Sequence, residues 1–196
     1  MEYVISSCRV AQATTDEEIL QARTARQYVM NCEFYCSMFL LPILNKALKL
    51  GCSKDTFVSH LRNAKGLNPD RIELLGVGFD RFLAEDYVSC IHILVVQVEA
   101  WIRDLLYSMG GQTTYVKDQI AHVHTLGTIL SSELIKRAFG SRVWSYVNAI
   151  LNDDLAFGLR DKVAHGLCET SEFNRNKAAL LIHVCLLLTN ITLTRA

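Results

Sequence analysis

The sequence contains little proline and no excess of either charge. Two prolines occur in 196 residues, and 20 basic side chains balance 20 acidic ones. So few prolines permit long, uninterrupted helices. The zero net charge excludes a global basic field that would attract nucleic acid nonspecifically. Apolar residues instead make up 51% of the chain, which favours a sizeable core, a subunit interface, or both.

The sequence also lacks the features of an exported or membrane-bound protein. Its seven cysteines are odd in number and form no CxxC motif, which predicts buried thiols in a reducing compartment rather than a disulfide framework. No basic segment followed by a long apolar run opens the chain, and no apolar run reaches the roughly 18–20 residues that a membrane helix needs. We therefore expect a cytoplasmic protein with no membrane partner.

Sequence motifs for metals and cofactors are missing as well. The chain has no glycine-rich phosphate loop, no HExxH and no GxSxG. His122 and His124 are closely spaced, but no carboxylate or cysteine accompanies them at a ligand spacing, so two exposed loop histidines are the simpler interpretation. We expect no metal site and no cofactor.

Helical periodicity dominates the chain, and no segment alternates convincingly like a strand. Caps at Thr15, Ser53, Asn68 and Asp86 mark helix starts. The predicted helices cover approximately residues 15–50, 53–65, 69–84, 86–109, 126–139, 143–151, 155–165 and 171–194, with a polar connection at 112–125. This pattern predicts an all-α fold. Its expected core is an antiparallel bundle of segments 86–109, 126–139, 155–165 and 173–194, with the N-terminal helices packed beside it.

A polar stripe crosses the otherwise apolar helix predicted over residues 86–109. His92, Glu99 and Arg103 recur at positions i, i+7 and i+11, and therefore share one face. Glu99 and Arg103 also form an i, i+4 pair in the favourable order. This stripe is either a salt bridge at the bundle edge or a set of groups that orient catalytic residues.

The segment Arg160-Asp161-Lys162-Val163-Ala164-His165-Gly166 combines a permanent cation with a titratable imidazole. Arg160 and His165 are about 140° apart on an ideal helix, whereas Asp161 and His165 share a face. Asp161 is thus a candidate to hold the imidazole in one tautomer. In the alternative interpretation, Arg160 pairs with a neighbouring acid and His165 only favours the negative C-terminal end of the helix.

The segment Arg160–His165 resembles the Arg-[polar]-x-x-x-His signature of the HEPN superfamily, the "higher eukaryotes and prokaryotes nucleotide-binding" domains. The extension to Gly166 is similar to a branch whose motif reads Arg-Asn-x-x-x-His-Gly, with aspartate here in place of asparagine. An earlier helix pattern is similar too, and its matching residues are His92, Leu94, Gln97, Glu99 and Arg103. The resemblance implies a HEPN-like helical bundle over residues 81–196. It does not extend to residues 1–80, which the helical pattern predicts to be a helical extension packed on this core.

The resemblance also implies a function. Many HEPN proteins are metal-independent endoribonucleases of defence or toxin–antitoxin systems, and others are noncatalytic modules for dimerisation or for binding nucleotides or RNA. Carried over to this chain, Arg160 and His165 are the catalytic pair, with Asp161, Glu99 and Arg103 in support. The implied partners are an RNA substrate, a second copy of the chain, and an antitoxin or regulatory protein. A dimer through the motif face would offset the 140° separation by adding a second Arg160 and His165.

Overall fold

The structure, a computed structural model, describes residues 3–6, 9–12 and 15–191. Helices dominate this part of the chain, and the predicted all-α class is confirmed. A short antiparallel hairpin of β1 (Tyr3–Ser6) and β2 (Arg9–Gln12) precedes the first helix. No helix within these ranges is long and apolar enough to cross a membrane.

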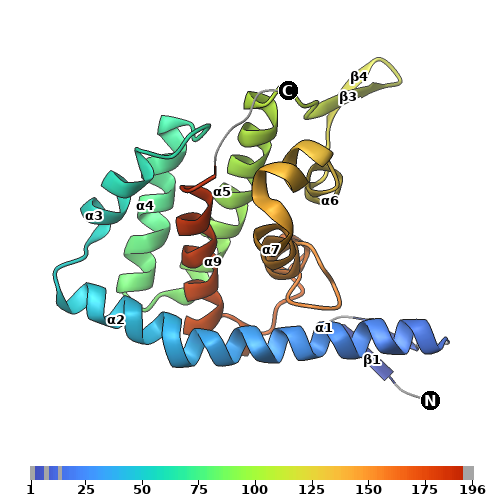
Figure 1. Cartoon of the computed structure of the whole chain (residues 1–196), viewed down its shortest axis with the longest axis horizontal. Coiled ribbons are helices and arrows are strands. Elements are labelled where there is room, and N and C mark those ends of the chain that lie inside the picture. The colour runs from blue at the N-terminus through green and yellow to red at the C-terminus, as the bar shows by residue number, and fades with distance from the viewer. Residues whose placement is uncertain (1–2, 7–8, 13–14, 192–196) are drawn as a thin grey trace.

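A long helical rod lies across one end of the bundle (Figure 1). It consists of α1 (Asp16–Tyr35), the π-helical turn η1 (Cys36–Leu40) and α2 (Leu41–Lys49). Thr15 opens it with a capping box: the Thr15 hydroxyl accepts from the Glu18 backbone N–H, and the Glu18 carboxylate accepts from the Thr15 backbone N–H. The rod thus begins at the predicted cap and ends one residue before the predicted Leu50.

The core of the bundle is formed around α5 (Tyr87–Ser108), which packs against α4 (Pro69–Leu83) on one side and α9 (Arg175–Leu188) on another. The caps at Asn68 and Asp86 are present as predicted, and Ser53 caps α3 (Lys54–Leu61). Helices α4 and α5 approach closely at Gly78, where an added Cβ would lie 2.6 Å from Leu94 Cδ2. One continuous core therefore joins helices from both sides of residue 80.

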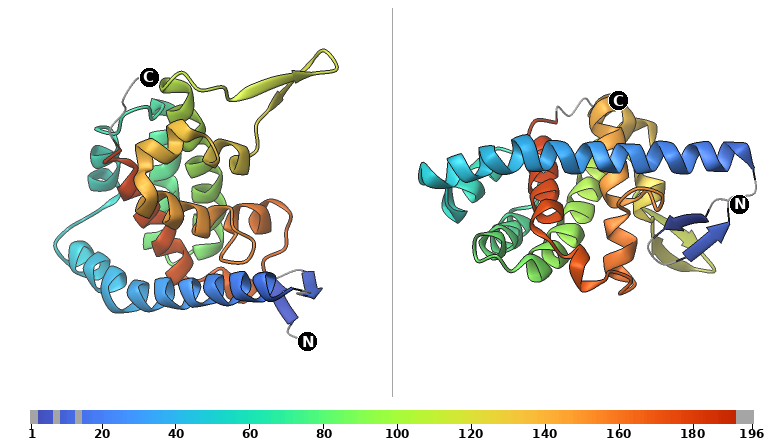
Figure 2. Two further views of the ribbon diagram at one scale, coloured as in Figure 1. Left: turned by 45° about the vertical axis from the view of Figure 1, so that its right-hand side comes forward. Right: turned by 90° about the horizontal axis from the view of Figure 1, so that it is seen from below.

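The second half of the chain completes the bundle through α6 (Leu126–Leu130), α7 (Glu133–Leu151) and α8 (Leu159–Ala164). A 3-10 turn at Thr170–Glu172 leads into α9, which Asn174 caps. The predicted break at Gly140 is present as an interruption of α7 with φ 66° and ψ 165°. Figure 2 shows α7 beside α5 and α9, with the connection to α8 folded back toward the rod.

Several predicted boundaries were wrong. The polar connection 112–125 contains a protruding hairpin of β3 (Thr114–Lys117) and β4 (Ile120–Val123), joined by Asp118 and Gln119 with positive φ (Figure 1). The Asn-Gly or Asp-Gly signal of such a turn is absent here, so the sequence pattern does not predict the hairpin. Ser131 and Ser132 separate α6 from α7 within the helix predicted over 126–139, and α9 begins later than the predicted Ser171. The predicted end of the last helix near Thr194 lies outside the described residues.

His183 on α9 makes the stability of this fold depend on pH. Its Nδ1 lies 2.9 Å from the Tyr146 hydroxyl, and burial lowers the pKa of the imidazole below its ordinary value of 6.5. The unfolded chain therefore binds this proton more readily than the folded chain does. The stabilisation is complete above pH 6.5, and it is lost as the pH falls toward the folded pKa.

We expect the free energy of unfolding, measured by urea denaturation, to fall between pH 7.5 and 5.5 more steeply in the wild type than in His183→Asn. Asparagine retains a polar atom near the Nδ1 position but does not titrate. For a single proton, the difference in slope can reach at most about 1.4 kcal/mol per pH unit. Parallel pH curves for the two proteins would contradict this assignment.

Candidate functional site

Helix α8, which carries the Arg160–His165 motif, begins four residues later than predicted. Gly158, its N-cap residue, adopts a left-handed conformation with φ 50° and ψ 35°. A Cβ at this position would lie 3.1 Å from the Asp153 carbonyl oxygen, so the turn requires glycine for both conformation and space. The segment before Gly158 is therefore a connection, and the helix starts at Leu159.

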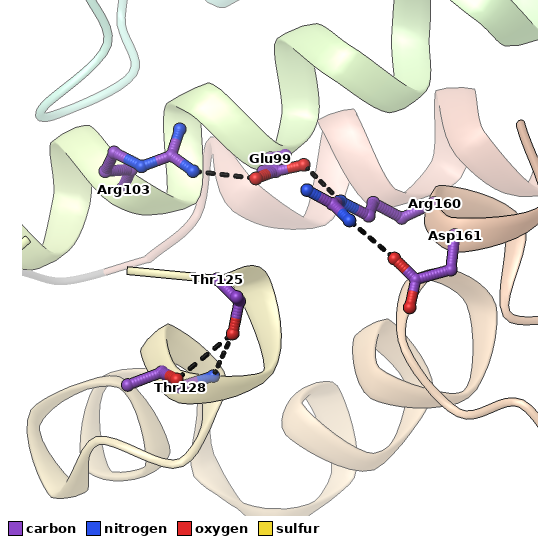
Figure 3. Close-up of polar contacts among 6 residues, drawn as sticks. All are labelled: Glu99, Arg103, Thr125, Thr128, Arg160 and Asp161. Atoms are coloured by element: carbon purple, nitrogen blue, oxygen red, sulfur yellow. Dashed lines mark hydrogen bonds and ion pairs between the residues drawn. The ribbon is translucent and has the colours of Figure 1, made fainter. Parts of the chain in front are cut away.

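A chain of ion pairs links α5 to the motif on α8 (Figure 3). Glu99 Oε1 accepts from Arg103 Nη2 at 2.7 Å, and Glu99 Oε2 accepts from Arg160 Nε at 2.8 Å. Arg160 Nη1 then donates to Asp161 Oδ1 at 2.5 Å. The polar stripe of α5 therefore contacts the motif directly, through one carboxylate shared by two guanidinium groups.

The shared carboxylate is the least exposed of the four side chains that form these ion pairs. The Glu99 side chain is 13% exposed, whereas Arg103 and Arg160 are 24% and 28% exposed. A carboxylate so far from water needs partners of opposite charge. Hydrogen bonds to Glu99 first, and to Asp161 second, raise the pKa of the Arg160 guanidinium further above its ordinary value. Arg160 thus remains a cation, but its charge is balanced by the carboxylates of Glu99 and Asp161.

His165 lies at the opposite end of α8, as its C-cap residue, and its side chain is exposed. Its backbone N–H donates to the Asp161 carbonyl, while its imidazole has no hydrogen bond or ion pair with the part of the chain that the structure describes. The imidazole is therefore accessible to a ligand from solvent.

The structure contradicts the expected hydrogen bond between Asp161 and His165. Asp161 Oδ1 accepts from the adjacent Arg160 instead. Arg160 reaches both this carboxylate and that of Glu99 through different nitrogens of its guanidinium. Asp161 thus supports the guanidinium and does not orient the imidazole.

Two other residues of the α5 pattern lie away from the ion pairs. His92 is exposed, its Nδ1 lies 2.8 Å from the Val88 carbonyl oxygen, and its ring stacks on Phe173 at 5.0 Å. Gln97 leaves a buried Oε1 without a hydrogen-bond partner among the residues described. Of the original stripe, Glu99 and Arg103 are joined to the motif and His92 is not.

Lys162, inside the motif, is 9% exposed and is therefore not presented to solvent. Its charge acts on Glu172, whose carboxylate also accepts from Lys177 Nζ at 2.9 Å. Burial works to raise the pKa of Glu172, but the hydrogen bonds and positive charges around it keep that pKa below the ordinary value. Lys162, Glu172 and Lys177 thus form a second charged cluster, between α8 and the start of α9, that the sequence did not reveal.

Two further features were not predicted. The Thr125 hydroxyl, at the N-cap of α6, lies 3.1 Å from the Thr128 hydroxyl, and Figure 3 draws this pair together with the ion pairs. The Thr-x-x-Thr spacing before an apolar run was the available signal.

A groove of about 610 Å³ also lies between α1 and α7, bordered by the connection that precedes Gly158. Neither Arg160 nor His165 lines it.

Within the described ranges, no group of three or more histidine, cysteine, aspartate or glutamate residues is placed to hold a metal ion. The six cysteines in these ranges are not disulfide-bonded. Comparisons with protein-family models, with curated proteins and with solved structures find no match for this chain.

Replacing Glu99 tests whether the shared carboxylate holds α5 and α8 together. In Glu99→Gln, one of the two guanidinium groups faces an amide that donates rather than accepts. We expect the free energy of unfolding to fall by about 1–3 kcal/mol, the cost of removing a partner from a largely buried charged group.

Glu73→Gln is the matched control, because Glu73 pairs with Arg62 at 3.8 Å with both side chains about two-thirds exposed. This change should alter stability by less than about 0.5 kcal/mol. Equal losses in the two variants, measured by urea denaturation, would show that Glu99 is not a structural link.

Proposed function

We propose that this protein is a metal-independent endoribonuclease of HEPN type, with His165 and Arg160 as the residues that act on the RNA. The observation that supports the proposal is the accessible imidazole of His165 on the same short helix as a partly exposed, firmly anchored guanidinium. The five-residue separation corresponds to about 7.5 Å along the helix axis and about 140° around it. In this proposal the long arginine side chain and the phosphodiester together bridge both the distance and the angle.

The reaction uses the nucleophile that RNA itself carries. The 2′-hydroxyl attacks the adjacent phosphorus, the bond to the 5′-oxygen breaks, and a 2′,3′-cyclic phosphate forms. His165 removes the proton of the 2′-hydroxyl or gives a proton to the leaving 5′-oxygen. Proton transfer of this kind contributes roughly 10²–10⁴-fold to a reaction rate.

Arg160 stabilises the charge that develops on the phosphorane oxygens. A guanidinium has five N–H groups, of which the two ion pairs with Glu99 and Asp161 use two. The remaining three can donate to phosphate while Glu99 keeps the side chain in place. Asp161 is 42% exposed and can turn toward solvent when an anion approaches.

The proposed setting is the cytoplasm, where RNA is the substrate and an antitoxin or regulatory protein restrains the activity. The chain carries no net charge, so recognition of RNA depends on the local arrangement around α8 rather than on an overall basic surface.

One observation favours a second candidate, a noncatalytic HEPN module that binds RNA or nucleotides or regulates a partner. Both ion pairs of Arg160 are internal, so the guanidinium presents little net charge to a ligand. In this role the ion pairs of Arg160 serve only to hold α8 against α5, and His165 takes part in no reaction.

A nuclease assay on long mixed-sequence RNA in EDTA separates the two candidates. We expect the wild type to cleave the RNA, to leave 2′,3′-cyclic phosphate ends detectable by mass spectrometry, and to leave DNA of the same sequence intact. His165→Ala should lose roughly 10²–10⁴-fold in rate, and Arg160→Ala should be nearly inactive. Circular dichroism checks that each variant is folded.

His122→Ala and Arg62→Ala serve as controls, since both replace exposed side chains of the same types outside the motif. Both should cleave at the wild-type rate. Cleavage by His165→Ala at the wild-type rate, or strict dependence on magnesium, would refute the mechanism. If the wild type binds RNA without cleaving it, the noncatalytic module is the better description.

A further inference from the structure

A group of large apolar side chains remains exposed around the middle of the helical rod. This aromatic patch comprises Met30, Phe34, Tyr35, Met38, Phe39 and Ile43. Between 54% and 64% of each residue is exposed. The Tyr35 ring contacts those of Phe34 and Phe39, with centroids 5.8 and 5.6 Å apart. Exposed apolar residues are ordinary when they are scattered, but contiguous groups mark interaction sites.

The inner side of the rod is anchored, so the patch cannot turn inward. Cys36 is 1% exposed, and its thiol lies 3.5 Å from the Asn176 carbonyl oxygen. Asn176 also donates to the Ser37 hydroxyl, and Arg175 donates to Asn45 Oδ1. These contacts tie η1 and α2 to the first turn of α9, where the rod lies against the end of the bundle (Figures 1 and 2). The patch therefore faces away from the core of its own chain.

The area of the patch matches the contribution of one protomer to a stable dimer. Six side chains of this size, each slightly more than half exposed, present about 100 Å² each, or about 600 Å² in all. Homodimer interface cores are roughly 65% apolar, so this area corresponds to an interface of about 900 Å² per protomer. Standard specific interfaces bury about 800 Å² per partner.

The charge pattern also favours a copy of the same surface. Between Tyr28 and Asn45 the sequence contains one charged residue, Glu33. Two such surfaces can meet with little like-charge repulsion, whereas a strongly charged ligand such as RNA finds no basic residue within this segment. The π-helical turn lies in the middle of the patch, and such turns occur frequently at functional positions.

We infer that the aromatic patch of the rod is the interface of a two-fold homodimer of this chain. A two-fold axis through the patch brings the same residues of both copies together and covers them in one step. This interface differs from the motif face that the sequence favoured for dimerisation, and it does not depend on the proposed nuclease activity.

Multi-angle light scattering on the wild type and three variants tests the inference. At 5–100 μM the wild type should have the mass of a dimer, and Phe34→Asp/Met38→Asp should have the mass of a monomer. Tyr107→Asp places the same charge on another large side chain, one that is 74% exposed on α5, and it should remain a dimer. His165→Ala should also remain a dimer, which separates this interface from the motif face.

Circular dichroism should show wild-type helicity in the double variant, since both residues are exposed. If that variant is unfolded, Phe34→Ser alone replaces it and should shift the dimer dissociation constant upward by at least tenfold. A monomeric wild type at 100 μM would overturn the inference and would assign the patch to another protein or another segment. A dimer that persists in the folded double variant, or in Phe34→Ser with an unchanged dissociation constant, would overturn it as well.

Discussion

The Glu99 carboxylate is the constraint on which the candidate site depends. It projects from α5, the helix around which the core is built, and its side chain is only 13% exposed, so partners of opposite charge offset the cost of its burial. Arg103 supplies one partner from the same helix, and Arg160 supplies the other from α8. The need to neutralise this group fixes α8 against α5, holds the Arg160 guanidinium, and leaves His165 exposed at the far end of the helix.

Local signals in the sequence predicted most of the fold. Caps at Thr15, Ser53, Asn68 and Asp86 act within one helical turn, and each begins a helix where expected. The start of α8 depends instead on the fit of Gly158 against the Asp153 carbonyl, which only the folded connection reveals. The β3–β4 hairpin has no clear sequence signal either, because no glycine occupies its turn, where Asp118 and Gln119 adopt positive φ.

The contrast between local sequence signals and contacts that only the folded chain makes also applies to the site and to the rod. The sequence identified every member of the ion-pair chain, because charged residues in an apolar helix are conspicuous. It left two partners open for Asp161, His165 and Arg160, and the structure pairs Asp161 with Arg160, which Glu99 of α5 also holds. The high apolar fraction indicated an interface, but the segment from Tyr28 to Leu44 is apolar around most of its circumference. Only the packing of η1 and α2 on α9 shows which side remains uncovered.

A double-mutant cycle between Glu99 and Arg160 tests the central claim most directly, namely that this ion pair joins α5 to the motif. The free energies of unfolding of the wild type, Glu99→Gln, Arg160→Gln and the double variant would be measured by urea denaturation at pH 7.5. A direct, largely buried contact predicts a coupling energy of about 1 kcal/mol or more. A coupling energy below about 0.3 kcal/mol, with independent effects of the two changes, would contradict the account.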